Sequence, residues 1–440
     1  MLLQFSIKNF RTFKEKATLS FLASNYDKDT RELDNIFFGE RFGLRVLKSA
    51  VIYGANASGK SKLLDAIEFM KDFVVNSSKE SQKGEEIGVK PFRLSSETEK
   101  APSEFEVIFD LHNVIYRYGF ETTKEKIISE WLYSKSNAKE IEIFYRDDEN
   151  ILTHDKIFSK GKTIIKEGLI RDNALLVSVA AQFNDDTSIL ILNWFRELNI
   201  ISGLSEHNFK NNTIIKIKSD KDKNKILDFL KAADLGIQDI EYEEFTLGES
   251  SEEIKQQFKK MREQMKNIDP EAFSDISTIH NVYDSKKKIV NSTKFSVTKD
   301  ESNGTRKFLY LSGTIIDVIE RGGILIADEL DSKLHPNLVC RIVSLFNSKE
   351  VNKKNAQLIF NTHDTNLLSS GLFRRDQIWF TDKNKYGEGK LYSLADFKSD
   401  EVRKGEAFEE NYIRGKYGAV PFLGFFDSLN KILSQHEDQE

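Results

Sequence analysis

A glycine-rich stretch near the N-terminus has the residue types and the spacing that hold a chain of phosphates. Residues 54–61 fit the pattern G-x-x-x-x-G-K-[ST]. In such a loop, backbone N–H groups surround a β-phosphate at the start of a helix, where the helix dipole also favours an anion. Lys60 is expected to bridge the β- and γ-phosphates, and Ser61 is expected to bind Mg²⁺. The residues expected to contact the nucleotide here are Gly54, Asn56, Ala57, Ser58, Gly59, Lys60, Ser61 and Lys62.

Two adjacent carboxylates follow an apolar run in the second half of the chain. Residues 324–327 are typical of a buried strand, and Asp328 and Glu329 stand at its C-terminal end, where ligands collect in α/β sheets. Asp328 is expected to hold Mg²⁺, directly or through water. Glu329 is placed to polarise an attacking water as a general base. Together with the phosphate loop, this pair predicts the binding and hydrolysis of a nucleoside triphosphate.

A histidine and a second anion-binding nest extend this chemistry. His363 follows an apolar strand at 357–361, where it can hydrogen-bond the γ-phosphate as a catalytic residue. Ser302 and Gly304 stand at the start of a helix and form the nest. One chain cannot easily bring both nests to one nucleotide, whereas a two-fold dimer can, with the partner's Ser302 facing Lys60. The alternative is an ordinary helix cap at Ser302 or Asn303.

An α/β domain is needed to position these residues, and the pattern of apolar residues predicts its elements. Phe5, Ile7 and Phe10 are the expected buried positions of the first strand pair. The expected elements are two strands in 1–22, a strand, loop and helix in 45–72, a loop in 77–90, an antiparallel four-stranded meander in 103–145, a mainly helical region in 172–243 with its clearest helices at 189–198 and 226–235, a helix from about Asn303, a strand at 324–327, a helix at 336–347, and strands at 357–361 and 377–380.

A short heptad-like seam lies in the middle of the chain. Its apolar residues are Ile254, Phe258, Met261, Met265 and Ile268. Because it lasts only about two heptads, it predicts a hairpin that packs on its own domain, with a dimer or partner contact as the alternative. The expected division of the chain is an N-terminal ATPase lobe at 1–172, a mainly helical insertion at 173–293 and a C-terminal ATPase lobe at 294–440.

The overall composition limits the class of protein. The chain has 440 residues and a net charge of −5, so no global positive field draws it to nucleic acid. Cys340 is the single cysteine, which excludes an internal disulfide and fits a reducing cytoplasm. No run approaches the roughly 18 apolar residues that a membrane span requires. We therefore expect a cytoplasmic protein without a membrane contact.

With these residues the chain resembles the ABC-type ATPases of the RecF/SMC/OLD group. More narrowly, it is similar to the RloA and abortive-infection type of AAA ATPase found in bacterial defence islands. The resemblance covers nearly the whole chain. It is carried by Ile7–Phe13, the phosphate loop, Asn173–Gln182, Ser302–Thr305, Asp328–Asp331 with Leu334–Pro336, Thr362–Asp364 and Lys416–Pro421.

The resemblance implies an ABC-type P-loop head with an inserted antiparallel β-lobe and a helical subdomain, but no long coiled coil. It implies ATP and Mg²⁺ as cofactors and a head-to-head homodimer, or a higher homo-oligomer. Asp331 matches the D-loop that touches the partner subunit, and Gln182 is the candidate for the glutamine that senses Mg²⁺ and water. Arg11 matches an arginine near the phosphates. The signature at 301–305 departs from Leu-Ser-Gly-Gly-Gln, which suggests that contacts across the dimer are either weaker or use Arg306 and Lys307.

The resemblance also implies what the ATPase serves. The first hypothesis is a defence ATPase that senses phage infection and controls a separate effector, an RloB-like nuclease encoded beside it. The alternative is a RecF-like ATPase of DNA repair that contacts DNA. Its candidate basic strip is Lys210, Lys216, Lys218, Lys221, Lys223 and Lys225. A transporter subunit and an autonomous nuclease fit less well. Residues 411–418 mix basic and aromatic types, and we expect a turn buried against the core there, with a partner or nucleic-acid contact as the alternative.

Overall fold

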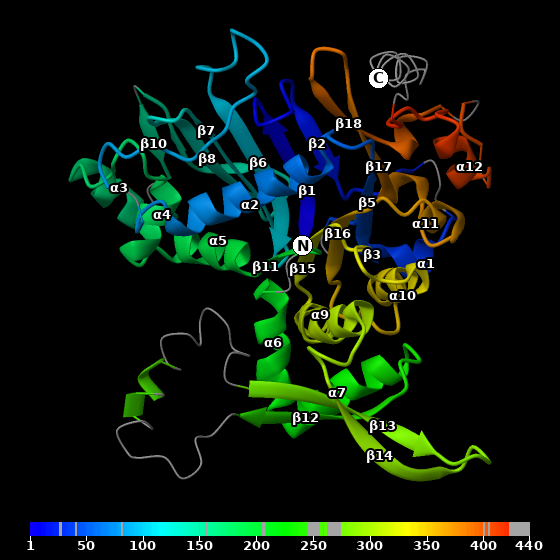
Figure 1. Ribbon diagram of the computed structural model, residues 1–440. Helices are drawn as coiled ribbons and strands as arrows, with labels where there is room; N and C mark the ends of the chain where they lie inside the picture. The colour runs from blue at the N-terminus through cyan, green and yellow to red at the C-terminus, as the bar shows by residue number, and fades with distance from the viewer. Residues whose placement is uncertain are drawn as a thin grey trace, which may run out of the picture.

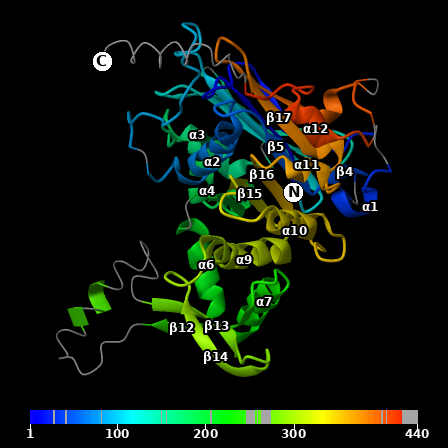
Figure 2. The same cartoon turned by 45° about the vertical axis from the view of Figure 1, so that its right-hand side comes forward.

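The protein is described from a computed structural model (Figures 1 and 2). The structure describes residues 1–25, 29–39, 42–80, 82–148, 150–154, 156–204, 207–244, 256–257, 259–261, 274–398, 401–403 and 405–421. Its two large sheets share one core. Figure 1 shows them in the upper part of the molecule, with a smaller sheet below.

The phosphate loop leaves a six-stranded sheet in which five strands are parallel. The order is β11-β15-β16-β5-β17-β18, and only β18 is antiparallel. The bounds are β5 (Ser49–Tyr53), β11 (Leu198–Ser202), β15 (Ile324–Asp328), β16 (Gln357–Asn361), β17 (Ile378–Lys383) and β18 (Gly389–Ser393). Both faces of this sheet are covered, because alternate residues of β5 and β15 belong to two different apolar clusters. This explains why these strands are continuous apolar runs in the sequence.

The predicted meander is confirmed, but it is not a separate lobe. Its strands join the first two strands of the chain in one antiparallel sheet of order β10-β9-β8-β7-β6-β1-β2. The bounds are β1 (Leu2–Lys8), β2 (Ala17–Ser20), β6 (Ser103–Leu111), β7 (Val114–Thr122), β8 (Ile127–Lys135), β9 (Ile141–Arg146) and β10 (Ile151–Thr153). Phe5, Ile7 and Phe10 are buried as expected. A small pair, β3 (Ile36–Phe38) and β4 (Arg45–Leu47), forms a two-stranded sheet of its own.

Helices fill the space between and around the sheets. Aromatic side chains of α2 (Lys60–Asn76) and α5 (Asp186–Arg196) pack on the seven-stranded sheet, with ring centroids 5.0 Å apart for Phe69 and Phe105 and 4.0 Å apart for Phe109 and Trp194. The remaining helices are α1 (Glu32–Asn35), α3 (Ser159–Lys166), α4 (Leu176–Gln182), α6 (His207–Ile217), α7 (Asp220–Lys231), α9 (Asn303–Arg321), α10 (Pro336–Asn347), α11 (Asn366–Ser369) and α12 (Phe408–Ile413), with 3₁₀ turns at Arg375–Gln377 and Leu394–Asp396. None of the described helices is long and apolar enough to span a membrane.

Two parts of the middle region differ from the sequence prediction. Residues 198–202 form β11, a strand of the core sheet that pairs with β15, and not the end of a helix. A three-stranded antiparallel sheet, β12 (Ile237–Glu244), β13 (Ser274–Tyr283) and β14 (Ile289–Ser296), was not predicted. The heptad-like seam lies largely outside the described residues. The boundaries expected after residues 172 and 293 stay predictions.

A buried carboxylate ties the seven-stranded sheet to α4. The side chain of Glu130 on β8 is fully buried and lies 3.1 Å from Nε of Arg146. Its two oxygens also accept hydrogen bonds from the backbone N–H groups of Leu176 and Val177 and from the hydroxyl of Tyr118. The carboxylate therefore caps the N-terminus of α4 and neutralises a largely buried guanidinium.

We expect Glu130→Ala to lower the free energy of unfolding by about 3–5 kcal/mol, because it leaves the Arg146 charge buried without a partner. Urea denaturation followed by circular dichroism measures this loss. Glu140→Ala is the control, since Glu140 pairs with Arg117 at an exposed site and its loss should cost less than about 1 kcal/mol. Equal losses in the two variants would contradict the assignment.

Candidate functional site

The phosphate loop has a backbone shape that two glycines make possible. Gly54 has φ 152° and Gly59 has φ 121°. A Cβ at Gly54 would lie 2.4 Å from the carbonyl oxygen of Thr381, and a Cβ at Gly59 would lie 2.8 Å from Oγ1 of Thr12. Neither position has room for a side chain. Ser58 adds a hydrogen bond of 2.6 Å to the hydroxyl of Thr381 on β17, which holds the loop against the sheet.

The side chain of Lys60 folds back onto the phosphate loop. Its Nζ donates to the carbonyl oxygens of Gly54 at 2.7 Å and Ala55 at 3.3 Å. Burial lowers the pKa of Lys60, although the carboxylates of Glu329, Asp328 and Asp331 act in the opposite direction. A buried ammonium in the first turn of a helix favours an anionic ligand, so the loop fits a polyphosphate.

One side chain that was not predicted connects the loop to the carboxylate pair. Asn361, the last residue of β16, has its Nδ2 3.5 Å from Oγ of Ser61 and hydrogen-bonded to Oδ1 of Asp328. Its Oδ1 accepts the backbone N–H of Glu329. The two expected Mg²⁺ ligands, Ser61 and Asp328, therefore contact the same amide group. The parallel pairing β15-β16-β5 creates this arrangement, because it brings three carboxyl ends to one edge.

Glu329 sits where the backbone is held in an uncommon conformation. Its φ is 51°, in the left-handed region that non-glycine residues rarely adopt. Gly203 follows β11 and packs on this backbone, with its N–H donating to the carbonyl oxygen of Asp328. A Cβ at Gly203 would lie 1.9 Å from the carbonyl oxygen of Glu329. The position of the expected base therefore depends on a glycine of the neighbouring strand.

The segment after the carboxylate pair contacts both the histidine loop and the second nest. The carboxylate of Asp331 accepts the backbone N–H of His363 at 3.3 Å, and the His363 side chain is exposed. Lys307 is fully buried and donates to the carbonyl oxygens of Leu330, at 3.1 Å, and Ser332. The suggestion that Lys307 reaches a partner's nucleotide is therefore wrong, because its ammonium is used inside the chain.

The second nest is a capped helix start at the surface. Ser302 is the N-cap of α9, and its Oγ accepts the N–H of Thr305 at 3.1 Å. This confirms the alternative reading of a helix cap, but it leaves Ser302 and Asn303 exposed, as a contact across a dimer requires. The carboxylate of the preceding residue, Glu301, is hydrogen-bonded to side chains of β13. Thr278 donates to its carboxylate, and Nε2 of His280 lies 2.8 Å from the same oxygen.

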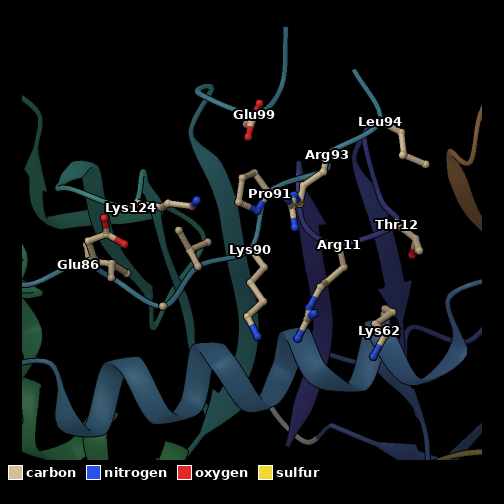
Figure 3. Close-up of a pocket in the computed structure, with 13 residues that line it drawn as sticks. Arg11, Thr12, Lys62, Glu86, Lys90, Pro91, Arg93, Leu94, Glu99 and Lys124 are labelled. Atoms are coloured by element: carbon tan, nitrogen blue, oxygen red, sulfur yellow. The ribbon is translucent and has the colours of Figure 1, made fainter. Parts of the chain in front are cut away.

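A cavity of about 540 Å³ lies beside the first turn of α2, where Lys62 contributes to its wall (Figure 3). Five of the thirteen residues that line it are cationic, and Figure 3 shows Arg11 and Lys90 extending side by side toward α2, near Lys62. Nη2 of Arg11 lies 3.7 Å from Oδ2 of Asp65, while the buried Nε of Arg11 has no hydrogen-bond partner. Arg11 thus lies within about a turn of helix of Ser61. The lining cations are Arg11, Lys62, Lys90, Arg93 and Lys124.

Gln182 lies away from the phosphate loop and the carboxylate pair. It is the exposed last residue of α4, and Figure 1 shows α4 beside the end of α2 that lies far from the phosphate loop. Ser178 of α4 bonds to Ser78, just beyond that end of α2. The carboxylate pair is flanked instead by Ser202, the last residue of β11, and by Gly203, which follows it. The role expected for Gln182 stays a prediction.

The C-terminal aromatic segment is buried against the core, as expected. Tyr412 packs on Tyr53 and Phe380, with ring centroids 5.6 and 5.3 Å away. Its hydroxyl donates to the carbonyl oxygen of Ala419 at 3.1 Å, and burial raises the pKa of Tyr412 to about 12. Tyr53 directly precedes Gly54, so this segment supports the base of the phosphate loop.

One family model matches the chain over residues 49–369, from the first residue of β5 to the end of α11. The family is described as "AAA domain, putative AbiEii toxin, Type IV TA system". The chain belongs to this family. The AAA domain thus contains the phosphate loop, Ser302, the carboxylate pair and His363, and the chain is an ATPase-family protein. No curated protein matches its sequence.

Solved structures with a similar chain path include heads of SMC proteins and an ATP-binding cassette. The SMC head domain from Thermotoga maritima is 14% identical, with 89% of this chain and 98% of that chain covered and a TM-score of 0.38. An SMC head from Pyrococcus furiosus, bound to the C-terminal domain of ScpA, is 12% identical, with 92% and 99% covered and a TM-score of 0.38. The dimeric cassette MJ0796, bound to ADP and Pi, is 12% identical, with 89% and 98% covered and a TM-score of 0.28.

Proposed function

We propose that this AAA domain binds ATP with Mg²⁺ and hydrolyses the ATP at an interface between two copies of the chain. The observation that carries the proposal is the side chain of Asn361. It contacts the hydroxyl of Ser61, the carboxylate of Asp328 and the backbone of Glu329. The groups needed to bind phosphate, hold a cation and activate water therefore meet at one edge of the sheet.

The residues present fit the cofactor. Ser61 and Asp328 both contact Nδ2 of Asn361, so one cation can be shared by the same two oxygens. Mg²⁺ is usually held by one or two protein oxygens together with substrate phosphates. Among the described residues no group of three His, Cys, Asp or Glu side chains gathers to hold a metal alone. When bound, Mg²⁺ would neutralise charge on the phosphates.

Each residue of the site then has a defined task. Lys60 leaves the carbonyl oxygens of Gly54 and Ala55 and pairs with the phosphates, which compensates its buried charge. Glu329 orients the attacking water and accepts its proton. Asn361 positions both carboxylate residues. His363 hydrogen-bonds the γ-phosphate and, through Asp331, connects that contact to the partner's surface.

The cavity beside the loop takes the rest of the nucleotide. Its volume of about 540 Å³ lies within the range of roughly 300–1,000 Å³ of small-ligand sites. Arg11 and Lys62 line this cavity, and Lys62 directly follows Ser61 of the phosphate loop. The unpartnered Nε of Arg11 supplies a donor for an α-phosphate or a ribose oxygen.

The exposed Ser302 nest supports dimerisation, since it lies on the surface at the start of a 19-residue helix. The biological role is proposed from the resemblance to the RloA and abortive-infection type and from the family description. In this proposal the dimer senses phage infection and controls a separate nuclease effector.

The RecF-like alternative loses its main support. Of the six lysines in the candidate DNA-binding strip, Lys216, Lys223 and Lys225 form ion pairs with carboxylates, at 3.1, 2.9 and 2.6 Å for the shortest of each. Lys210 and Lys218 lie over the rings of Tyr310 and Tyr242. Because carboxylates already compensate three of the six charges, the strip offers less to a phosphate backbone than its lysine count suggests.

Loss of the Lys60 ammonium tests the site. We expect Lys60→Ala to weaken binding of a fluorescent ATP analogue by at least about tenfold and to abolish phosphate release, because the loop loses its charge-assisted hydrogen bonds. Lys349→Ala, at an exposed lysine after α10, is the control. Chelation of Mg²⁺ by EDTA should stop phosphate release from wild type. Unchanged binding by Lys60→Ala would overturn the proposed site.

A further inference from the structure

The three-stranded sheet ends in a strand whose outer edge pairs with no other strand among the described residues. β14 is the last strand in the order β12-β13-β14, and it is exposed at nearly every position. The inner face of the sheet packs on α7, where Ile240, Ile276 and Val297 join the apolar cluster that includes Leu230. Figures 1 and 2 both show the β13–β14 hairpin extending past α7, at the end of the molecule away from the two large sheets.

Large apolar side chains gather near the tip of this hairpin. Tyr283 is 57% exposed, Ile289 is 62% exposed and Val290 is 60% exposed. Val282 and Phe295 add to the same hairpin with exposures of 36% and 39%. A long edge strand with exposed aliphatic side chains is a template for pairing with another strand, which proteins normally block with charge or cover.

The turn of the hairpin adds positive charge that no described carboxylate pairs with. Lys286, Lys287 and Lys288 are consecutive and exposed, and none forms an ion pair with a described residue. The nearby carboxylate of Asp284 is engaged in the turn, where Oδ1 accepts the backbone N–H groups of Lys286 and Lys288 at 2.9 and 2.8 Å. The turn is thus ordered by its own hydrogen bonds and presents three ammonium groups to solvent.

We infer that the open edge of β14 is a docking site for an extended, acidic segment of a partner protein. The segment pairs with β14 as a fourth strand, packs apolar side chains on Ile289 and Val290, and directs carboxylates toward Lys286–Lys288. Main-chain hydrogen bonds provide the affinity in this mode of recognition, and the side chains provide the specificity.

The observations favour a protein strand over the other occupants. A nucleic acid needs a track of cations, whereas the only lysine in β14 is Lys294, which already pairs with Glu241 and Glu243. A second copy of β14 does not match the charge, because residues 289–296 contain no carboxylate. Backbone edge groups flanked by aliphatic side chains are matched by another strand.

Docking at this edge would reach the second nest of the proposed ATPase. β14 pairs with β13 along its length, and Thr278 and His280 of β13 contact the carboxylate of Glu301. Glu301 directly precedes Ser302. This link rests on the proposed function, whereas the docking site itself does not.

Peptide binding to the full chain tests the docking site without nucleotide. The probe is a fluorescein-labelled peptide of alternating glutamate and valine, and the matched probe alternates lysine and valine. Fluorescence anisotropy should show saturable binding of the acidic peptide, about tenfold tighter than binding of the basic one. The double variant Ile289→Ser with Val290→Ser should weaken it at least about tenfold, since its apolar contacts are lost.

Charge reversal makes the test specific. In the triple variant Lys286→Glu, Lys287→Glu and Lys288→Glu, the preference should invert, so that the basic peptide binds more tightly. Reversing Lys349, Lys353 and Lys354, another exposed set, should change nothing. The inference is overturned if the acidic and the basic peptide bind the wild-type chain with equal affinity, or if neither peptide binds. Two other results would also overturn it. One is binding of labelled duplex DNA that the triple variant at Lys286–Lys288 abolishes. The other is a nucleotide-free dimer, measured by light scattering, that dissociates in the Val290→Ser variant.

Discussion

Replacing Glu329 with glutamine should lower the rate of ATP turnover by about 10²–10⁴-fold, because the amide cannot accept the proton of the attacking water. ATP binding should persist, since the phosphate loop and Lys60 are untouched. The bound ATP should then hold two copies together. Light scattering with ATP and Mg²⁺ should therefore show a stable dimer for Glu329→Gln, and wild type should return to its starting mass as ATP is consumed.

Glu350→Gln, at an exposed carboxylate after α10, is the matched control and should behave as wild type. A variant that still hydrolyses ATP at the wild-type rate would remove Glu329 as the base. A variant that is inactive but has the same mass with and without ATP would keep the base and remove the dimer. In that case Ser302 would remain only the cap of α9.

A single methyl group at Gly203 should reduce turnover by roughly 10²-fold, the usual cost of misplacing a catalytic group by about 1 Å. The Cβ of Gly203→Ala would lie 1.9 Å from the carbonyl oxygen of Glu329, so one of the two backbones must move. Affinity for an ATP analogue should change little, because β5 and the phosphate loop are not involved. Phosphate release and analogue binding, measured side by side, separate the two effects.

The same pair of strands offers a control. Gly323 precedes β15, and a Cβ there would have no neighbour closer than 3.6 Å, an ordinary contact. Gly323→Ala should therefore retain wild-type turnover. If Gly203→Ala were equally active, the close packing of β11 on the carboxylate pair would not matter for catalysis. Near-ultraviolet circular dichroism of both variants should show a retained core.

The sequence predicts an element with correct bounds where local signals and burial agree. The helix at 336–347 was predicted with its observed bounds, because Pro336 marks its first turn and apolar residues follow at helical spacing. The strand at 357–361 was also found, since a short apolar run bounded by polar residues is typical of a buried parallel strand.

Other parts of the molecule depend on contacts that the sequence does not display. The strand β11 follows α5 with only Glu197 between them, and its apolar residues read as a continuation of the helix. Asn361 becomes a site residue only because β16 lies between β15 and β5. The one sequence signal that could have identified Asn361 is its amide side chain at the end of a strand, two residues before His363. No sequence signal identifies Gly203, because the Glu329 backbone that packs against it lies more than a hundred positions later in the chain.

The central position of β5 has a consequence for how the protein is made. β5 and its phosphate loop are synthesised early, yet β5 pairs on one side with β16 and on the other with β17, near residues 357–361 and 378–380. Thr381, which bonds Ser58, follows later still. A nascent chain therefore carries the phosphate-binding motif without the strands that shape it until synthesis has passed Thr381. The proposed ATP site is thus incomplete in any shorter nascent chain.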